Sequence, residues 1–285
     1  TTTTDGDVLA IETASGKVRW RRGLSSDFGG MMMSQWQWAE SPLVDGDRVV
    51  VTPGSPRAAI VALNKLTGAD IWRAAMPPLG SAGRDGAGYS SVVISSGAGV
   101  KQYVQLMGRG VAGFRASDGQ FLWGYNRVAN GTANISMPVV SGNFVFASTS
   151  YDAGSVLLEL SPAANGGVAA KDKYFLDGGT FQNHHGGIVL LGSYLYGGHG
   201  LRNGFPVCIE LATGKMMWSR VRGPGAGSAA VMAADGRLYY RYEDGTMALV
   251  DPSPAAFKEV SRFTIPGPRT YSWSHPVIAA GRLYL

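Results

Sequence analysis

Seven polar side chains of this sequence have the chemistry to bind a ligand or a metal ion, and they recur at one place in its repeats. Each lies just before a segment that we expect to form the first strand of a repeat. The set comprises Glu40, Tyr89, Asn134, His184, His185, Ser228 and His275. We expect the starts of the first strands, and therefore these side chains, to converge around one opening. A carboxylate, a phenol, an amide and several imidazoles arranged in this way are of the kind that bind a small ligand or a metal ion.

Three interpretations of this set are open. Polar residues and water can line an opening where nothing binds, a small ligand can bind there, or the imidazoles can hold a metal ion. The sequence contains no His-x-x-x-His or Cys-x-x-Cys spacing that would favour a metal. We therefore assign no catalytic residue and no metal ligand. Glu40, His184 and His185 are the residues that we expect to contact a bound ligand.

The elements that must position these side chains are set by a repeated phrase. Residues 62–72 are expected to form a strand, a tight turn closed by Thr-Gly, and a second strand that ends on Trp72. Copies at residues 10–20, 113–123 and 208–218 keep the same internal spacing. Each copy belongs to a unit of about 45 to 52 residues, which is typical of a repeat architecture.

Each part of the phrase has a physical role. Alternation of apolar and polar residues indicates a half-buried strand, and the glycine supplies the positive φ that a short hairpin loop needs. A tryptophan is too large to bury inside one four-stranded sheet, so it must pack against the neighbouring sheet. The residues predicted to dock in this way are Trp20, Trp72, Trp123 and Trp218. Four-stranded units that stack through such contacts form a β-propeller.

The fold class that we predict is all-β, a propeller of four-stranded antiparallel blades in a single domain over residues 1–285. Five whole units lie between Glu40 and Phe263, with a half unit before them and the complementary half after them. If the halves complete one blade, the ring is self-closed with six blades. Otherwise the chain is a fragment of a seven- or eight-bladed ring and part of a longer protein. Where the Thr-Gly-Trp ending is missing, Phe175 and Phe263 are expected to replace the tryptophan.

Composition limits the classes of partner. The net charge is +5, and the only dense basic group, Arg19, Arg21 and Arg22, is expected to be a solvated strand edge and not a nucleic-acid site. The single cysteine, Cys208, excludes an internal disulfide and is expected to be a buried thiol. No segment is long and apolar enough to span a membrane.

An irregular segment over residues 27–38 has two interpretations. It either covers one end of the propeller or forms the aromatic rim of a binding site. Trp36 and Trp38 are the aromatic residues that we expect to be exposed and able to dock a partner.

The phrase in residues 62–72 and its copies resembles the tryptophan-docking repeat of the PQQ-like (quinoprotein alcohol dehydrogenase-like) β-propeller family, over nearly the whole chain. That family includes dehydrogenases that use pyrroloquinoline quinone (PQQ) and non-catalytic members such as the outer-membrane β-barrel assembly lipoprotein. The resemblance implies a bacterial protein of the periplasm or the cell exterior. An active quinoprotein of the family is expected to have adjacent cysteines, a calcium site and eight blades. This chain has one cysteine, and Asp45-Gly46-Asp47 fits a hairpin turn better than a calcium loop.

The function predicted from these observations is a non-catalytic scaffold for binding or protein assembly in the bacterial cell envelope, without a cofactor. Its partner is a protein or a small ligand of unspecified identity, with no nucleic acid involved, and no oligomeric state is predicted. One alternative is a PQQ-dependent oxidoreductase that uses PQQ with calcium. The other is polysaccharide or small-ligand binding at the mouth of the propeller.

Overall fold

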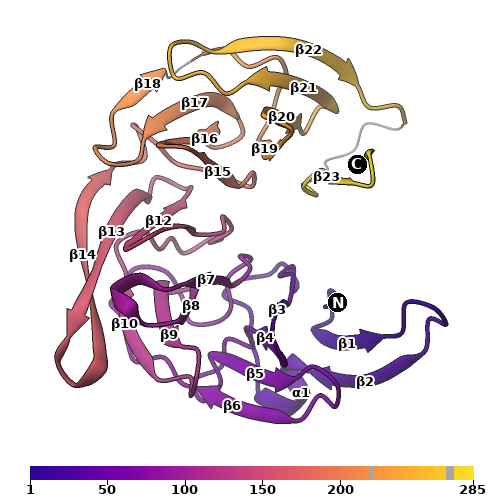
Figure 1. Ribbon diagram of the computed structural model, residues 1–285, viewed down its shortest axis with the longest axis vertical. Coiled ribbons are helices and arrows are strands. Elements are labelled where there is room, and N and C mark those ends of the chain that lie inside the picture. Colours follow the sequence, from indigo (N-terminus) through magenta and orange to yellow (C-terminus); the bar gives the residue numbers. More distant parts are fainter. Residues whose placement is uncertain (219–220, 268–272) are drawn as a thin grey trace. The chain divides into compact units, whose positions relative to one another are not determined.

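The computed structural model describes residues 1–218, 221–267 and 273–285, and strands make up most of its regular structure (Figure 1). The chain divides into two compact units. The first unit comprises Thr1–Ala147 with Leu158–Lys173, and the second comprises Ser148–Leu157 with Tyr174–Leu285. Within the described residues, no helix is both long and apolar enough to cross a membrane.

The first unit begins with a two-stranded sheet and a short helix, which two four-stranded sheets follow. The first part contains β1 (Asp7–Ile11), β2 (Val18–Gly23) and α1 (Leu24–Phe28). The first four-stranded sheet contains β3 (Leu43–Asp45), β4 (Arg48–Val51), β5 (Ile60–Asn64) and β6 (Asp70–Ala74). The second contains β7 (Val93–Ser95), the 3₁₀ turn η1 (Gly97–Gly99), β8 (Gln102–Met107), β9 (Gly110–Arg115) and β10 (Phe121–Tyr125).

A third four-stranded sheet has strands whose residues divide between the two units, and the second unit then adds two more. The third sheet contains β11 (Val139–Ser141), β12 (Phe144–Thr149), β13 (Gly154–Ala163), the 3₁₀ turn η2 (Ala164–Gly166) and β14 (Gly167–Leu176). The fourth contains β15 (Ile188–Leu191), β16 (Tyr194–His199), β17 (Phe205–Glu210) and β18 (Met216–Trp218). The fifth contains β19 (Ala229–Ala234), β20 (Arg237–Tyr242), β21 (Thr246–Asp251) and β22 (Lys258–Thr264), and a final pair contains β23 (Val277–Ala279) and β24 (Arg282–Tyr284).

Strands in each sheet are hydrogen-bonded in chain order, as in the blades of a propeller. Among the described residues, five four-stranded sheets lie between two pairs of strands, which confirms the predicted succession of whole and half units. The predicted sixth blade would join β1–β2 of the first unit to β23–β24 of the second, and it stays a prediction.

The repeated phrase forms the hairpin expected of it. In residues 62–72 the loop between β5 and β6 is closed by Gly68, whose φ is +71°. Its N–H donates to Asn64 O at 2.8 Å, while Asn64 Oδ1 accepts the N–H groups of Leu66 and Thr67. The register shifts between Ala62 and Leu63, so the hairpin contains a bulge. Here glycine is required because other residues disfavour this φ.

The tryptophan of one sheet meets the turn glycine of the next sheet. The Trp20 indole lies against Gly68, and its Nε1 donates to Lys65 O at 2.9 Å. The Trp72 indole lies in the same way against Gly119 and donates to Ala116 O at 3.2 Å. That these indoles hold neighbouring sheets together stays a prediction, and the two contacts are its basis.

The other two tryptophans differ from each other. In the second unit, Trp218 Nε1 donates to Ser253 O at 2.8 Å, and its ring packs edge-on against Phe257. Trp123 Nε1 instead donates to Gln102 Oε1 inside its own sheet, at 2.5 Å. The tryptophan of the repeated phrase therefore donates its hydrogen bond outside its own sheet at Trp218 but within its own sheet at Trp123.

Phe175 does not replace a missing tryptophan as we expected. Tyr174 has that position in the second unit, because its ring lies against the turn glycine Gly214 and its hydroxyl donates to Leu211 O at 2.9 Å. Neighbouring residues of a strand face opposite sides, so the choice of Phe175 was wrong by one residue. Phe263 lies on β22 and is 48% exposed. Its predicted docking would involve the sixth blade, which draws on both units, so it stays a prediction.

Candidate functional site

The seven predicted site residues belong to different units. Glu40, Tyr89 and Asn134 are in the first unit; the other four, which are His184, His185, Ser228 and His275, are in the second. Each group is described below within its own unit. The convergence of all seven on one opening stays a prediction.

Glu40 is buried in a hydrogen-bonded group of the first unit. Its Oε1 accepts the Thr52 N–H at 2.7 Å, and Gln105 Nε2 lies 3.5 Å from its Oε2. The Gln105 amide also donates to Thr52 Oγ1 and to Ser90 O. Burial raises the pKa of Glu40 to about 7, against hydrogen bonds from Thr52 that lower it. Each of these groups has a protein partner, so Glu40 fits a structural role.

Tyr89 and Asn134 hold loops of the first unit together. The Tyr89 hydroxyl lies 2.7 Å from Ser34 Oγ and 3.3 Å from Trp36 O. Asn134 Nδ2 donates to Met107 O at 2.8 Å. The Asn134 backbone carbonyl accepts the Tyr89 N–H. These bonds satisfy both side chains within the loops.

The two tryptophans of residues 27–38 have different environments. Trp36 is 40% exposed and packs edge-on against Tyr89, with ring centroids 5.9 Å apart. Trp38 is half-buried, and its ring packs on Gly6. A Cβ atom added to Gly6 would lie only 2.8 Å from the ring. The prediction that both are exposed is therefore wrong for Trp38, because Gly6 offers a flat backbone surface on which the indole packs.

The second unit brings three potential metal ligands together. His184, His185 and Glu243 each present one ligand atom, and these atoms all lie within 4.8 Å of one another. The two imidazole rings are 3.5 Å apart between centroids. His185 Nδ1 lies 3.3 Å from Glu243 Oε1, but the alignment is not that of a hydrogen bond, and this buried nitrogen has no hydrogen-bond partner among the described residues. We call these three residues the His-His-Glu cluster.

Both ring nitrogens of His184 face hydroxyl groups. Nδ1 lies 2.7 Å from Ser228 Oγ, and Nε2 lies 3.1 Å from the hydroxyl oxygen of Tyr151. Ser228 was among the predicted site residues, and it comes directly before β19. Two hydroxyl partners hold the imidazole in one orientation.

Tyr151 is aimed at His184 by a constrained turn. Tyr151 and Asp152, between β12 and β13, both have positive φ, +57° and +64°. The side chain of Gln182 fixes this turn, since its Oε1 accepts the Asp152 N–H at 3.0 Å and its Nε2 donates to Asp152 Oδ1 at 3.1 Å. Backbone outliers that are held by their surroundings cluster at functional sites.

Glu243 and Trp273 complete the surroundings of the cluster. Trp273 Nε1 donates to Glu243 Oε1 at 2.9 Å, and the Trp273 ring lies 4.9 Å from the His185 ring between centroids. His275, a predicted site residue, is exposed and bonds through Nε2 with His185 O at 3.1 Å. His275 therefore supports the backbone of the cluster and does not extend its ligand set.

Tyr151 and Glu243 were missed from the sequence. We considered only residues before each first strand, whereas Tyr151 and Glu243 follow the second strands β12 and β20. In an antiparallel sheet, the start of the first strand and the turn after the second strand lie at the same end. Polar residues in those turns are the signal that would have found them.

Burial keeps both imidazoles of the cluster uncharged at neutral pH. Desolvation lowers the pKa of His184 to about 4, and the neighbouring His185 lowers it further while Glu243 opposes the shift. The pKa of His185 is likewise lowered to about 4, chiefly by desolvation and then by Arg202. A neutral imidazole has a lone pair available for a cation.

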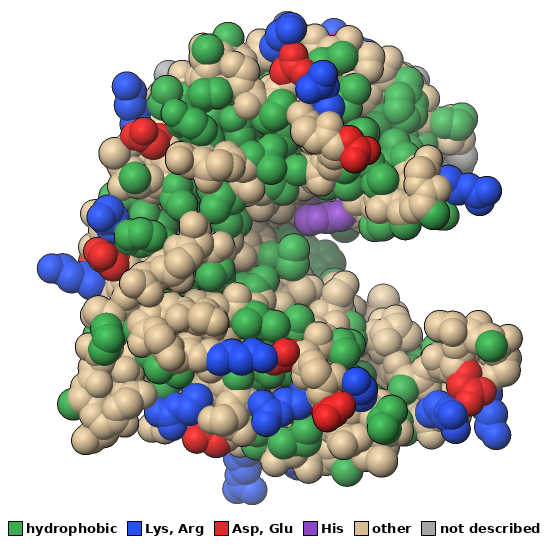
Figure 2. All heavy atoms as spheres, in the orientation of Figure 1, with side chains coloured by type: hydrophobic (Ala, Val, Ile, Leu, Met, Phe, Trp, Pro, Cys, Tyr) green, Lys and Arg blue, Asp and Glu red, His purple; other side chains and the backbone are tan. Residues whose placement is uncertain are grey.

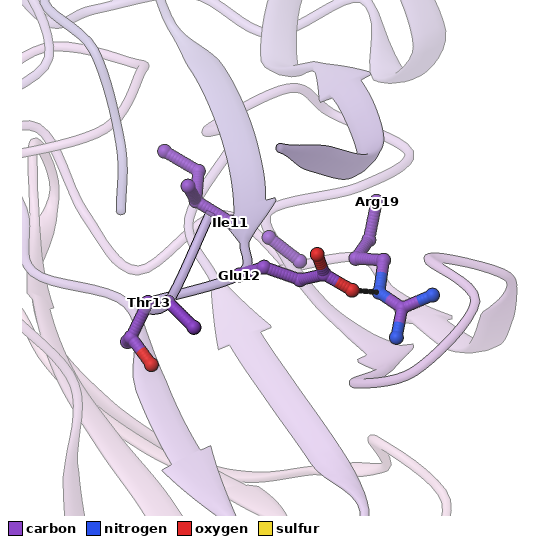
Figure 3. A pocket seen from close by; sticks show the side chains of 6 residues that line it. Ile11, Glu12, Thr13 and Arg19 are labelled. Atoms are coloured by element: carbon purple, nitrogen blue, oxygen red, sulfur yellow. Dashed lines mark ion pairs between the residues drawn. The ribbon is translucent and has the colours of Figure 1, made fainter. Parts of the chain in front are cut away.

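An open hollow of about 560 Å³ lies elsewhere, beside β1 of the first unit (Figure 3). It is lined by Ala10–Ala14 and Arg19, and Arg19 Nε forms an ion pair with Glu12 Oε1 at 2.8 Å. Ile11 is 43% exposed there. The hollow contains no histidine or cysteine, and its only charged groups neutralise each other.

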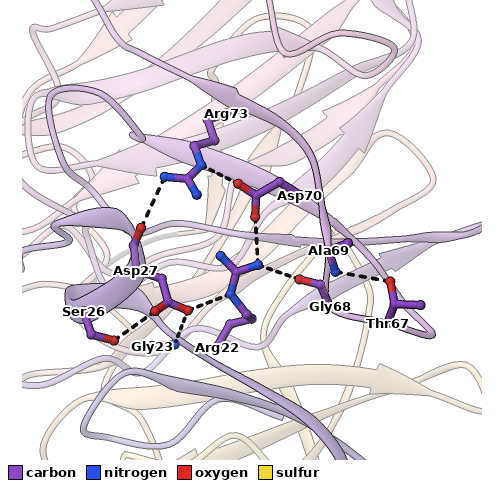
Figure 4. Close-up of polar contacts among 9 residues, drawn as sticks. All are labelled: Arg22, Gly23, Ser26, Asp27, Thr67, Gly68, Ala69, Asp70 and Arg73. Atoms are coloured by element: carbon purple, nitrogen blue, oxygen red, sulfur yellow. Dashed lines mark hydrogen bonds and ion pairs between the residues drawn. The ribbon is translucent and has the colours of Figure 1, made fainter.

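The dense basic group of the sequence is neutralised by carboxylates. Arg22 Nε bonds Asp27 Oδ2 at 2.6 Å, and its Nη1 bonds Asp70 Oδ1 at 2.8 Å (Figure 4). Arg21 pairs with Asp7, and Arg19 with Glu12. In Figure 2, Lys and Arg side chains are scattered, and several lie beside carboxylates. Paired and dispersed charges support the interpretation as a solvated strand edge.

The structure describes the two features that we compared with quinoprotein chemistry, the cysteine and the Asp45-Gly46-Asp47 segment. Cys208 is a buried thiol of β17 whose pKa burial raises to about 11, and the chain has no second cysteine. Asp45 and Asp47 flank Gly46, φ +58°, in the turn between β3 and β4. The Asp45 carboxylate accepts hydrogen bonds from Lys101 and Tyr103. These aspartates thus form a hairpin turn, as predicted, and Asp45 is committed to protein partners.

Comparison with known proteins identifies relatives of the chain. A family model described as outer membrane protein assembly factor BamB matches residues 1–220. The structure is similar to that of BamB from Moraxella catarrhalis, with a TM-score of 0.68 at 15% identity, covering 99% of this chain and 76% of that one. No curated protein matches the chain.

Two further solved structures share the fold. Quinohemoprotein alcohol dehydrogenase from Comamonas testosteroni has a TM-score of 0.52 at 14% identity, covering 85% of this chain and 46% of that one. The computationally designed Ika8 protein has a TM-score of 0.53 at 11% identity, covering 99% of this chain and 87% of that one. At such identities, structural similarity indicates the fold and not the activity.

Proposed function

Because the chain belongs to the family of the outer membrane protein assembly factor BamB, we propose that it is a non-catalytic propeller that binds a protein partner as an assembly scaffold. The observation on which this rests is the family match over residues 1–220. The proposed location is the periplasm or outer surface of the bacterial envelope. The proposed function needs no cofactor. Two observations support this part of the proposal: the single cysteine is buried, and the Asp45 carboxylate already accepts a hydrogen bond from Lys101.

Trp36 is the side chain that we propose as the centre of the docking surface. Its indole is 40% exposed, and its backbone is held by the bond from the Tyr89 hydroxyl. Ser34, two residues earlier, bonds both the Tyr89 hydroxyl and Thr132 O, so the loop is tied at two points. A large aromatic ring that is exposed on a fixed backbone loses little entropy when it binds, and tryptophan is enriched at the centre of protein interfaces.

Site-specific photocrosslinking in the native bacterium tests this function. A photoreactive residue at position 36 is expected to give one discrete crosslinked envelope protein, identified by mass spectrometry. Leu66, 74% exposed on a hairpin of the same unit, is the matched control position and is expected to give none. Identical crosslinks from both positions, or none from position 36, would contradict docking through Trp36.

Two further measurements separate scaffold from enzyme. The first is the affinity of the purified partner for variants of this protein. Trp36→Ala is expected to weaken that affinity by about 30-fold or more, as at an interface hot spot, whereas Leu66→Ala is expected to leave it unchanged. Incubation with PQQ and Ca²⁺ is expected to give no cofactor uptake and no dye reduction. Stoichiometric uptake with dye reduction would favour the oxidoreductase alternative.

A further inference from the structure

We propose that His184, His185 and Glu243 bind a divalent transition-metal ion, with Zn²⁺ as the best match. The ligand atoms are two imidazole nitrogens and one carboxylate oxygen, all within 4.8 Å of one another. Zinc binds such atoms at about 2.0–2.2 Å, so ligand atoms around one ion lie about 3–4 Å apart. Small side-chain rotations therefore bring the cluster to binding geometry.

An unsatisfied atom points to a missing partner. His185 Nδ1 is buried and makes no hydrogen bond within the described residues, although Glu243 Oε1 lies 3.3 Å away. The side chains of His185 and Glu243 are only 16% and 10% exposed. A buried polar atom without a partner costs free energy and requires an explanation. A cation between the imidazole and the carboxylate would satisfy both groups.

The groups around the cluster are those that support metal ligands. A ligating histidine usually bonds through its other ring nitrogen to an outer partner, which sets its orientation. His184 has two such partners, Ser228 Oγ and the Tyr151 hydroxyl, so one nitrogen can bind the ion while the other keeps its partner. Trp273 Nε1 likewise orients the Glu243 carboxylate. Gln182 locks the turn that delivers Tyr151.

The ligand types select the class of metal. Two imidazoles suit Zn²⁺, Co²⁺ or Ni²⁺, whereas Ca²⁺ and Mg²⁺ prefer sites made of oxygen atoms. Three protein ligands leave a fourth position for water or another group. The ion would tie the loop before β15 to the turn after β20, both in the second unit. This site does not depend on the proposed partner binding, which was assigned to Trp36.

Titration of the full chain, freed of metal with a chelator, tests the site. Isothermal calorimetry is expected to show one Zn²⁺ bound per chain, and Co²⁺ to give the visible absorption of a tetrahedral nitrogen and oxygen site. His185→Ala and Glu243→Gln are each expected to weaken Zn²⁺ binding by more than about 100-fold, beyond the 10–100-fold typical of outer partners. Glu210→Gln, the same change at an exposed hairpin of the same unit, is expected to bind as the unchanged protein does.

The outer partners give an independent readout. Ser228→Ala and Tyr151→Phe each remove one hydroxyl partner of His184. One ring nitrogen of His184 binds the ion, and the variant that removes the partner of the other nitrogen is expected to weaken Zn²⁺ binding by about 10–100-fold. Circular dichroism of each variant confirms that it is folded, and Glu243→Gln preserves side-chain volume if His185→Ala does not fold. The proposal is overturned if the metal-free protein binds no Zn²⁺, if folded Glu243→Gln binds it unchanged, or if neither outer variant alters the affinity.

Discussion

Trp72 packs its indole directly on Gly119, which lies in the turn between β9 and β10 of the following sheet. A Cβ atom on Gly119 would lie 2.6 Å from the ring, so only glycine leaves room for this contact. Trp72 is 9% exposed and belongs to a core with Tyr103 and Phe114, from the same following sheet. These two adjacent sheets of the first unit are therefore joined through a glycine, which has no side chain, and a tryptophan, which has the largest.

Gly119→Ala is expected to destabilise the protein by about 2–4 kcal/mol, because it adds overpacking to the cost of a positive φ. The control is Gly16→Ala, at the same place in the first copy of the phrase. Gly16 has a φ of +72°, close to the +76° of Gly119, but among the described residues nothing lies within 4 Å of its added Cβ. Urea unfolding followed by tryptophan fluorescence measures both. Equal losses would show that the indole contact contributes nothing.

Tyr174→Phe is expected to cost about 0.5–1.5 kcal/mol, because it removes the hydrogen bond to Leu211 O and leaves the ring on Gly214. Tyr239→Phe, the same change at a half-buried tyrosine on β20 of the same unit, is the control and should change little. The midpoint of urea unfolding reports the difference. A loss from Tyr174→Phe no larger than the control would argue against docking by this tyrosine.

Arg22→Lys is expected to cost about 1 kcal/mol, because a lysine cannot bond Asp27, Asp70 and Gly68 O together as the guanidinium does. The Arg22 guanidinium also lies over the Phe28 ring, 4.7 Å from its centroid. The matched change Arg19→Lys affects a 64% exposed side chain and should stay within about 0.5 kcal/mol. Chemical denaturation at low and high salt checks both. No loss for Arg22→Lys would refute a structural role for the network.

Glu40 is expected to make stability fall as the pH rises from about 4.5 to about 7. Its folded pKa, about 7, lies above the ordinary value of 4.5, so in this window the folded state keeps a proton that the unfolded state has lost. The full effect is on the order of 3 kcal/mol. Glu40→Gln cannot ionise, so its stability relative to the unchanged protein should rise across the window. A difference independent of pH would contradict a proton bound at Glu40.

The sequence by itself determined the succession of hairpins and sheets. The turn at Gly68 follows from local chemistry, because Asn64 and a glycine with positive φ form the loop wherever it is placed. The spacing of the tryptophan phrases predicted which sheets follow one another, and Cys208 was correctly expected to be buried. These features depend on short-range geometry and on periodicity, which the order of residues expresses directly.

Only the tertiary structure decided which side chains meet. Tyr174 and not Phe175 faces Gly214, because strand pleat and register, not residue type, select the inward side. Glu243 joins His184 and His185 because the turn after β20 and the loop before β15 come together in the folded second unit. Contacts between residues far apart in the chain depend on how sheets pack, and residue spacing alone does not specify that packing.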